Sequence, residues 1–279
     1  MGIVQNATQV AELVNNYRIV IDRTATHIVI PNGVTQIGAY AFYMSGALQS
    51  IHIPNSVTSI EQSAFGNCNA LKTIDIPTSV TSIEGSAFAY CGLTSIVIPD
   101  SVITLGNSAF INCNYAKTLT ISKHLERISN MAFSSCSKLQ SVNIPNSVLA
   151  IGSLAFQSCS KLTTVSLPAS LRTIESSAFQ NCIELSTVNI PSSLTSISNT
   201  AFNNCHELQH VTIDSGFNCD NLRLSASSAY LPETIVSWLE ALADRTGQVT
   251  YTLTIGQINL DKLTSEQIAI ATNKNWNLA

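Results

Sequence analysis

The chain has 279 residues, of which 45% are hydrophobic and only 11% are charged, whereas an ordinary soluble domain carries about 25% charged residues. Its surface must therefore be polar through Ser, Thr and Asn, and its length suffices for a large core in one or two domains. The net charge of -4 excludes the basic footprint of a nucleic-acid-binding protein, and no apolar run approaches the ~20 residues of a membrane span.

The N-terminal segment, residues 1–25, differs from the middle of the chain. Residues 8–17 have the pattern of a helix and residues 18–22 that of a strand, so we expect residues 1–25 to form an N-terminal cap over an open strand edge. The segment from Met1 lacks the basic region and apolar core of a signal peptide. We therefore expect either an intracellular protein or an exported one whose signal has been removed.

A 23-residue repeat occupies residues 26–216. The Phe of an Ala-Phe pair recurs once in every repeat, and one step is shortened to 22 by a deletion after Cys91. Seven of the eight Cys follow a repeat Phe by three positions, and seven of the eight Pro share a second column. The recurring Phe are Phe42, Phe65, Phe88, Phe110, Phe133, Phe156, Phe179 and Phe202.

One repeat can be interpreted physically. Ile74 and Ile76 alternate with polar residues, which predicts a short strand with one buried face. Pro77 ends that strand, and Val80 and Ile83 return a second apolar pair to the core. The Ser-Ala-Phe-x-x-Cys segment predicts a tight helical turn with Phe and Cys inside. Because one unit cannot bury its own apolar face, eight copies must stack into a parallel-sheet solenoid.

The pattern Leu-x-x-Ile-x-Ile-Pro-x-Ser-Val-x-x-Ile-x-x-x-Ala-Phe-x-x-Cys resembles the leucine-rich repeat of the BspA-like class. The resemblance covers residues 26–216 and implies a right-handed leucine-rich-repeat solenoid with helical caps. Bacterial surface proteins of this class bind host proteins and other bacteria. The resemblance therefore implies an exported binding protein, while its specificity for a particular ligand is weak.

Two outward columns of the predicted sheet carry the first candidate site. His52 and Asp75 are stacked neighbours beside Ser50 and Thr73, which offers a superficial Ser–His–Asp set. A nucleophile also needs oxyanion donors and a pocket, which a shallow sheet face lacks. The columns are otherwise hydroxyl ladders that favour strands and form a neutral platform for another protein. They contain no aromatic residue, which disfavours carbohydrate as the ligand.

The repeat around Ser122 departs most from its neighbours. It lacks the Pro and gathers basic and aromatic residues in a chain that is otherwise poor in charge. Ordinary drift of a tolerant surface explains such a cluster, but exposed Arg and Tyr also anchor interfaces. We therefore take as candidate binding residues Tyr115, Lys117, Lys123, His124 and Arg127, together with His52 and Asp75.

The segment from His206 to His210 reads His-Glu-Leu-Gln-His and matches the zinc-hydrolase motif H-E-x-x-H. That mechanism needs both His on one face of a helix, with Glu207 polarising a metal-bound water. The repeat register instead assigns Leu208 to the column before the strand and His210 to the strand itself. We therefore expect no metal and no other cofactor, and keep a zinc hydrolase only as an alternative.

The cysteines do not have the spacing of a metal or redox motif, since no C-x-x-C is present. Seven thiols in one column cannot all pair, so we expect small apolar side chains behind the Phe. Cys219 lies outside the column and is the one thiol we would test for reactivity.

After residue 216 the period ends, and residues 217–279 are predicted to form a C-terminal α/β cap. Pro232 is placed for a first helical turn, with Ile235, Leu239 and Leu242 on one face. Residues 250–255 alternate like a strand, and a capping box at Thr264 opens a last helix. Leu-Pro-Glu-Thr-Ile at residues 231–235 resembles a sortase signal, but the Gly and a following apolar segment are missing, and helix initiation explains it better. Residues 253–279 also resemble a tail module of proteins from host-associated anaerobes and their phages.

These observations predict a non-catalytic protein-binding scaffold that is extracellular or on the cell surface, with a cytoplasmic location left open. Its expected partner is a host or bacterial surface protein, with neither nucleic acid nor a membrane span involved. An alternative is a structural or host-recognition component of a phage-like particle, which the tail module motivates. The second, more remote alternative is the zinc hydrolase.

Overall fold

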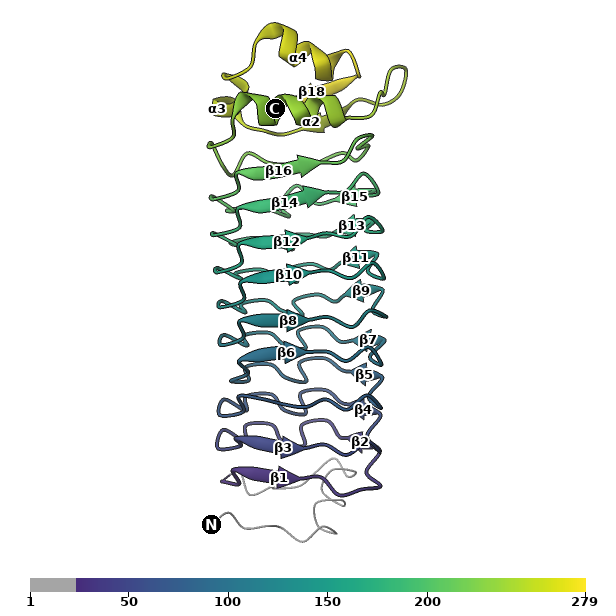
Figure 1. The fold of residues 1–279 in the computed structure, drawn as a ribbon, viewed down its shortest axis with the longest axis vertical. Coiled ribbons are helices and arrows are strands. Elements are labelled where there is room, and N and C mark those ends of the chain that lie inside the picture. The colour runs from purple at the N-terminus through teal and green to yellow at the C-terminus, as the bar shows by residue number, and fades with distance from the viewer. Residues whose placement is uncertain (1–23) are drawn as a thin grey trace.

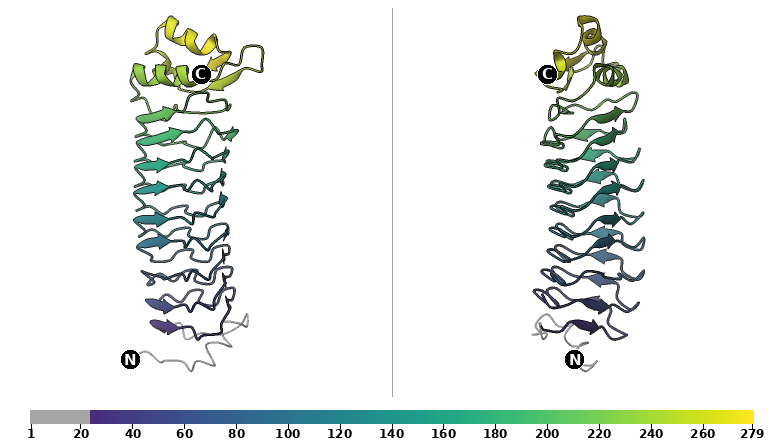
Figure 2. Two further views of the ribbon diagram at one scale, coloured as in Figure 1. Left: turned by 45° about the vertical axis from the view of Figure 1, so that its right-hand side comes forward. Right: turned by 60° about the vertical axis from the view of Figure 1, so that its left-hand side comes forward.

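The computed structural model describes residues 24–279 as an elongated column of stacked repeats with a helical region at its C-terminal end (Figure 1). The N-terminal cap expected over residues 1–25 lies outside these residues apart from its last two. Each repeat contributes one segment, here called a rung, to each of two sheet faces (Figure 2). A stack of turns closes the third side.

The first face is formed by β1 (His27–Val29), β3 (Ser50–His52), β6 (Ser95–Val97), β8 (Thr118–Thr120), β10 (Ser141–Asn143), β12 (Thr164–Ser166), β14 (Thr187–Ile190) and β16 (His210–Ile213). The second face is formed by β2 (Gln36–Ile37), β4 (Ser59–Ile60), β5 (Ser82–Ile83), β7 (Thr104–Leu105), β9 (Arg127–Ile128), β11 (Ala150–Ile151), β13 (Thr173–Ile174) and β15 (Ser196–Ile197).

All paired strands of the two faces are parallel, and partners lie one repeat apart, as Ser141 and Thr164 do on the first face. The expected solenoid is therefore confirmed. Its core is a column of parallel Phe rings whose centroids lie 5.0 to 5.8 Å apart. Phe133, for example, is fully buried between Phe110 and Phe156.

The buried Cys form a second column beside the Phe, as expected. Each thiol donates a weak hydrogen bond to the Phe carbonyl of the preceding repeat, such as Cys159 to Phe133 at 3.3 Å. All eight Cys are free and buried. The thiol thus fills space and also satisfies a carbonyl inside the core.

The prediction of a helical turn at Ser-Ala-Phe-x-x-Cys is wrong. Ser63 and Asn67 have φ of 52° and 63°, in the left-handed region, so a continuous right-handed helix cannot form. The amide of Phe65 donates to Ala87 of the next repeat at 2.8 Å, while that of Cys68 donates within its turn to Phe65 at 3.1 Å. Successive turns therefore hydrogen-bond to one another along the stack.

The first face is interrupted at residues 73–76, where the strand predicted from Ile74 and Ile76 is absent. The break lies beside the shortened repeat. Gly92 donates to Cys68 at 3.3 Å, and a Cβ on Gly92 would lie 2.1 Å from the Asn69 carbonyl oxygen. This tight connection joins the repeat that contains residues 73–76 to the repeat that contains β6.

Both faces are also interrupted at the repeat around Ser122. β8 pairs with β6, but β9 pairs with β11, so the two halves of this repeat belong to different blocks of sheet. Ser122 stands in the Pro column, is fully buried and donates to Val102 at 2.7 Å. In a regular repeat that bond comes from a Ser two positions after Pro, as Ser79 donates to Val57 at 2.6 Å.

The C-terminal region contains α2 (Pro232–Ala241), β17 (Tyr251–Leu253), α3 (Gln257–Leu260), α4 (Ser265–Thr272) and β18 (Trp276–Leu278). α2 begins at Pro232 and buries Ile235 and Leu239 as predicted. The capping box at Thr264 is also confirmed. α3 and the pairing of β17 with β18 were not predicted. α2 packs on the last rung, where the indole N–H of Trp238 donates to Val211 at 2.8 Å.

Candidate binding surface

The first face presents two outward columns of short polar side chains. On β10, Ser141 and Asn143 are exposed while Val142 between them is buried. The same alternation on β3 exposes Ser50 and His52 around Ile51. The residue pairs that the repeat register predicted for this face therefore do point to solvent.

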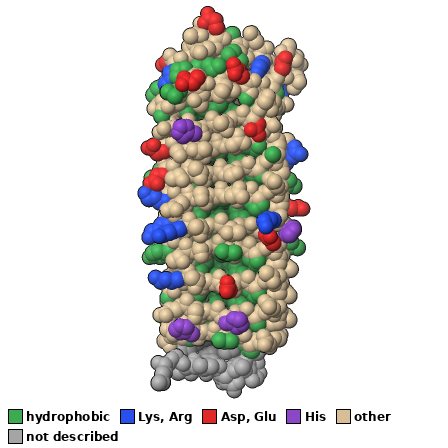
Figure 3. All heavy atoms as spheres, viewed as in Figure 1, with side chains coloured by type: hydrophobic (Ala, Val, Ile, Leu, Met, Phe, Trp, Pro, Cys, Tyr) green, Lys and Arg blue, Asp and Glu red, His purple; other side chains and the backbone are tan. Residues whose placement is uncertain are grey.

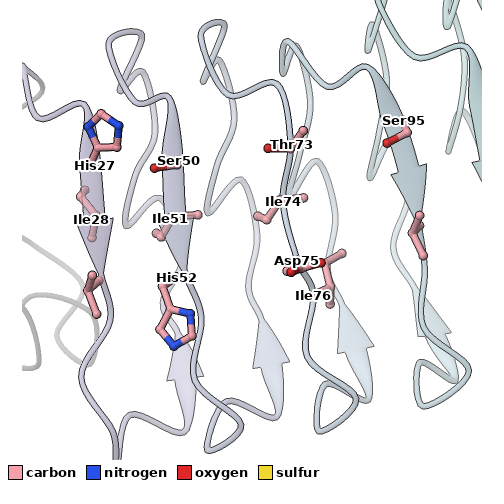
Figure 4. A pocket seen from close by; sticks show the side chains of 12 residues that line it. His27, Ile28, Ser50, Ile51, His52, Thr73, Ile74, Asp75, Ile76 and Ser95 are labelled. Carbon is pink, nitrogen blue, oxygen red and sulfur yellow. The ribbon is translucent and has the colours of Figure 1, made fainter.

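The interruption at residues 73–76 opens a groove of ≈ 710 Å³ at the N-terminal end of this face. No backbone hydrogen bond pairs residues 73–76 with β3 in the described chain. His27, His52 and Asp75 line the groove together with Val29 and Val97 (Figure 4). Val29 is 68% exposed and Val97 is 56% exposed, so apolar and ionisable side chains meet here. Binding pockets typically combine these two kinds of group.

His52 and Asp75 thus share the groove, but they do not form a catalytic set. Ser50 and His52 lie at the two ends of β3, and Asp75 stands on the next rung (Figure 4). No hydrogen bond or ion pair joins these three side chains within residues 24–279. A nucleophile and its base must lie within hydrogen-bond reach, and these three side chains do not have that arrangement.

The H-E-x-x-H segment is not helical. His206 lies in a turn with Nδ1 3.3 Å from the Ala226 carbonyl oxygen, and His210 begins β16 opposite Thr187. The predicted register is confirmed and denies the helical geometry that this zinc motif needs. In the described part of the chain, no three His, Cys, Asp or Glu side chains are grouped to hold a metal ion.

The structure divides the basic cluster predicted around Ser122 into three places. Tyr115 and Lys117 precede β8, at one edge of the first face. Tyr115 is 56% exposed, and the ammonium of Lys138 lies 5.0 Å from its ring centroid. Lys138 stands one repeat after Tyr115, and the repeat spacing could have identified it.

Lys123 and His124 follow β8, at the opposite edge. The Lys123 ammonium lies 3.1 Å from a carboxylate oxygen of Asp100, and its amide donates to the other oxygen at 3.0 Å. These hydrogen bonds hold the pKa of Asp100 below its ordinary value. Nδ1 of His124 lies 2.6 Å from the Asp100 carbonyl oxygen, so Asp100 organises this edge.

Arg127 lies on the second face, in β9, and its guanidinium is 2.7 Å from a carboxylate oxygen of Glu175, two repeats away. Partial burial raises the pKa of Glu175, but hydrogen bonds from Arg127 and Ser153 outweigh it and lower the pKa overall. Arg127 is therefore part of a polar network that also includes Asn130.

Two smaller hollows mark the interruption at the Ser122 repeat. One of ≈ 440 Å³ lies on the first face beside Lys123 and Asn143. The other, of ≈ 460 Å³, lies on the second face beside His124 and Arg127. Lys123, His124 and Arg127 thus border two separate hollows, and the predicted binding residues share no single site.

Cys219, the one thiol singled out for a reactivity test, is buried. Its side chain is only 2% exposed, and burial raises its pKa to about 11. A cysteine reacts as the thiolate, so this residue is protected both by access and by protonation.

Comparison with known proteins adds to this geometry. Residues 22–117 and 104–226 match the family described as BspA type leucine rich repeat region (6 copies). A leucine-rich repeat protein from Bacteroides ovatus is 27% identical with a TM-score of 0.65, over 83% of this chain and 56% of that protein. This chain thus spans little more than half of that protein. A Treponema pallidum leucine rich repeat protein is 26% identical with a TM-score of 0.43, over 68% of this chain and 74% of that protein. No curated protein matches this chain.

Proposed function

Because the chain belongs to the BspA-type leucine-rich repeat family, we propose that it is a non-catalytic scaffold that binds another protein through its first face. The groove carries this proposal, since the exposed Val29 and Val97 flank His52 and Asp75 along one column of an otherwise hydroxyl-lined surface. Clustered, solvent-accessible apolar groups with polar neighbours are where binding energy concentrates in protein interfaces.

The partner that this surface favours is a protein. Neither outward column contains an aromatic side chain on which a sugar ring could stack. The hydroxyl and amide side chains beyond the groove offer many weak hydrogen bonds without strong charge, which suits the polar rim of a protein interface.

We further propose that the protein acts as an adhesin, outside the cell or on its surface. The support is the family, whose members act at bacterial surfaces. None of the helices in residues 24–279 combines the length and apolarity of a membrane crossing. The Leu-Pro-Glu-Thr-Ile segment begins α2, which leaves its Thr within a packed helix and unsuited to sortase.

The test is a binding screen of the immobilised protein against extracellular-matrix proteins, bacterial surfaces and a glycan array, with metal content measured on the same sample. We expect a saturable protein hit and no stoichiometric zinc. One bound zinc with no protein hit would contradict the proposal and favour the zinc hydrolase.

Two matched variants then locate the site. Val97→Lys adds a charge in the groove, whereas Ser196→Lys adds the same charge on the exposed second face. We expect the first to weaken binding at least about tenfold, the loss of one interface anchor, and the second to leave it unchanged. Equal losses for both variants would contradict a site on the first face.

A further inference from the structure

One edge of the column, beside the first face, carries a run of charged side chains on successive repeats. The residue before the buried Leu of each repeat, or before Ala116 in one of them, forms this edge column. From the middle of the chain onward it reads aromatic, two basic, two acidic: Tyr115, Lys138, Lys161, Glu184 and Glu207. Along the left edge of Figure 3, Lys or Arg side chains give way to Asp or Glu toward the C-terminal end.

The members of the edge column stand on successive repeats. Lys138 lies over the ring of Tyr115. The next step is marked by the neighbouring serines, because the hydroxyl of Ser160 donates to the carbonyl of Ser137 at 3.3 Å. These serines precede Lys161 and Lys138 in the sequence. Lys161 and Glu184 form an ion pair. Adjacent rungs are separated by about 4.8 Å, so the four charges form a nearly straight and evenly spaced line.

This line of charge is complementary to itself when reversed. The order from Lys138 to Glu207 is plus, plus, minus, minus, and a two-fold axis between Lys161 and Glu184 inverts it. An anionic ligand that covered the same line would meet Glu184 and Glu207, and a cationic one would meet Lys138 and Lys161. The arrangement therefore fits a second copy of the chain better than a ligand of one sign, since a two-fold interface requires such self-complementarity.

The charged side chains are accessible. Lys161 and Glu184 have side chains 58% and 39% exposed, and the neighbouring column contains short Ser137 and Ser160. Ile183, next to Glu184, is 45% exposed and lies near the axis, where it would contact the second copy and exclude water.

We propose that this edge column joins two copies of the chain side by side in antiparallel orientation. Lys161 of each copy contacts Glu184 of the other, and Lys138 contacts Glu207. At the axis the two Lys161 and two Glu184 side chains form a square of alternating charge, which stabilises more than isolated surface pairs do. The proposal uses an edge and not the groove, so it stands or falls independently of the proposed function.

The expected dimer is weak and sensitive to salt. The test is analytical ultracentrifugation of the whole chain at concentrations up to about 1 mM, the range that exposed ion pairs suit. Raising the salt from about 0.01 M to about 1 M shortens the Debye length from about 30 Å to about 3 Å. We expect dimer at low salt and monomer at high salt. A chain that stays monomeric at both would overturn the proposal.

Charge reversal tests the pairing itself. Lys138→Glu/Lys161→Glu makes the edge wholly acidic, and Glu184→Lys/Glu207→Lys makes it wholly basic. Each variant should be monomeric alone, while an equimolar mixture should form a one-to-one dimer because every contact is then between opposite charges. Val97→Lys, in the groove, is the control and should dimerise like the native chain. Self-association of either charge-reversed variant, or no association in the mixture, would refute this geometry.

Discussion

The repeats and the C-terminal region satisfy their buried backbone groups in opposite ways. Within the repeats a single contact recurs from rung to rung, as when Cys136 donates to Phe110 at 3.4 Å and Cys182 to Phe156 at 3.2 Å. In residues 217–279 long side chains reach backbone carbonyls that are distant in the sequence. The ammonium of Lys274 contacts the carbonyl oxygens of Leu239, Glu240 and Leu242 at 2.6 to 3.1 Å.

The reason lies in what each region has as a neighbour. A repeat is flanked by nearly identical copies, so short side chains reach the next rung and charge can stay outside. The C-terminal region has no copy to stack on and therefore uses long side chains. Arg245, which is only 5% exposed, lies over the Tyr251 ring at 3.4 Å and donates to Val249. In the repeats, short contacts between neighbouring copies thus take the place of the long side-chain contacts found in the C-terminal region.

The two regions can be followed separately in solution. Both Trp residues, Trp238 and Trp276, lie in the C-terminal region, so tryptophan fluorescence reports its unfolding. Far-ultraviolet circular dichroism is dominated by the repeats. Predictions that act on one region should therefore move one signal more than the other.

Alkaline pH should affect the repeats most. Burial raises the pKa of Cys136 and of Cys205 from 9.0 to about 12. Above pH 9 the unfolded state releases these protons while the folded state keeps them, so stability falls as pH rises from 9 to 12. At pH 10 these two thiols together lower the free energy of unfolding by roughly 3 kcal/mol. Cys91, Cys113, Cys159 and Cys182, whose pKa values are also raised by burial, add to the loss.

Urea unfolding at pH 8, 9 and 10, followed by circular dichroism, measures this loss. The matched variant Cys136→Ala should lose about 1.4 kcal/mol less stability than the native chain between pH 8 and pH 10, because one buried thiol fewer releases its proton on unfolding. An unchanged slope would mean that the thiol of Cys136 is not protonated and buried as described.

Phe133→Ala comes next in size and removes one ring from the stacked column. We expect a cost of about 3–5 kcal/mol, because a fully buried ring leaves a cavity between rigid neighbours. Urea titrations followed by circular dichroism and by tryptophan fluorescence measure this cost. The midpoint seen by circular dichroism should move to lower urea by more than the midpoint seen by fluorescence. A cost below about 1 kcal/mol, the range of an ordinary surface change, would contradict the buried column.

These contacts differ in how far the sequence could predict them. Phe133 could be assigned to the core because the repeat spacing puts every repeat Phe in one register. The same register could have paired Lys123 with Asp100, which stand one repeat apart. It could not show the ion pair between Arg127 and Glu175, which skips a repeat.

The contacts of the C-terminal region could be predicted less well from the sequence. α2 could be predicted because Pro232 and the buried face repeat a local pattern. The partners of Lys274 are backbone carbonyls 32 to 35 residues away, and no side-chain pattern records a carbonyl acceptor. The groove likewise lies at residues 73–76, where Ile74 and Ile76 keep the alternation of a strand, so the pattern of these residues predicts the opposite of what is found.

Lys274→Met tests the C-terminal region in the same way. Its ammonium satisfies carbonyls at the end of α2, whose last turn contains no basic residue. Hydrogen bonds to charged groups contribute about 1.5–3 kcal/mol, and we expect a loss in that range. In urea titrations the fluorescence transition should move to lower urea, while the circular dichroism transition should move less. Lys274→Arg, which keeps the charge, is the control, and equal shifts of both signals would mean that the two regions unfold as one unit.

Ser141→Lys should have the smallest effect on stability. Ser141 is exposed in the middle of the first face, between Thr118 and Thr164 on the flanking rungs, and no charged side chain stands in its column on those rungs. A Lys there can extend into solvent, so urea titrations should agree with the native chain within about 0.5 kcal/mol, as for most surface changes.

This neutrality makes the variant informative about function, because any loss of partner binding must then come from the surface and not from unfolding. Weakened binding would extend the interface beyond the groove over the hydroxyl platform, whereas native binding together with the Val97→Lys loss would confine it to the groove. A large destabilisation instead would show that the middle of this face is packed, and would contradict its assignment as a free surface.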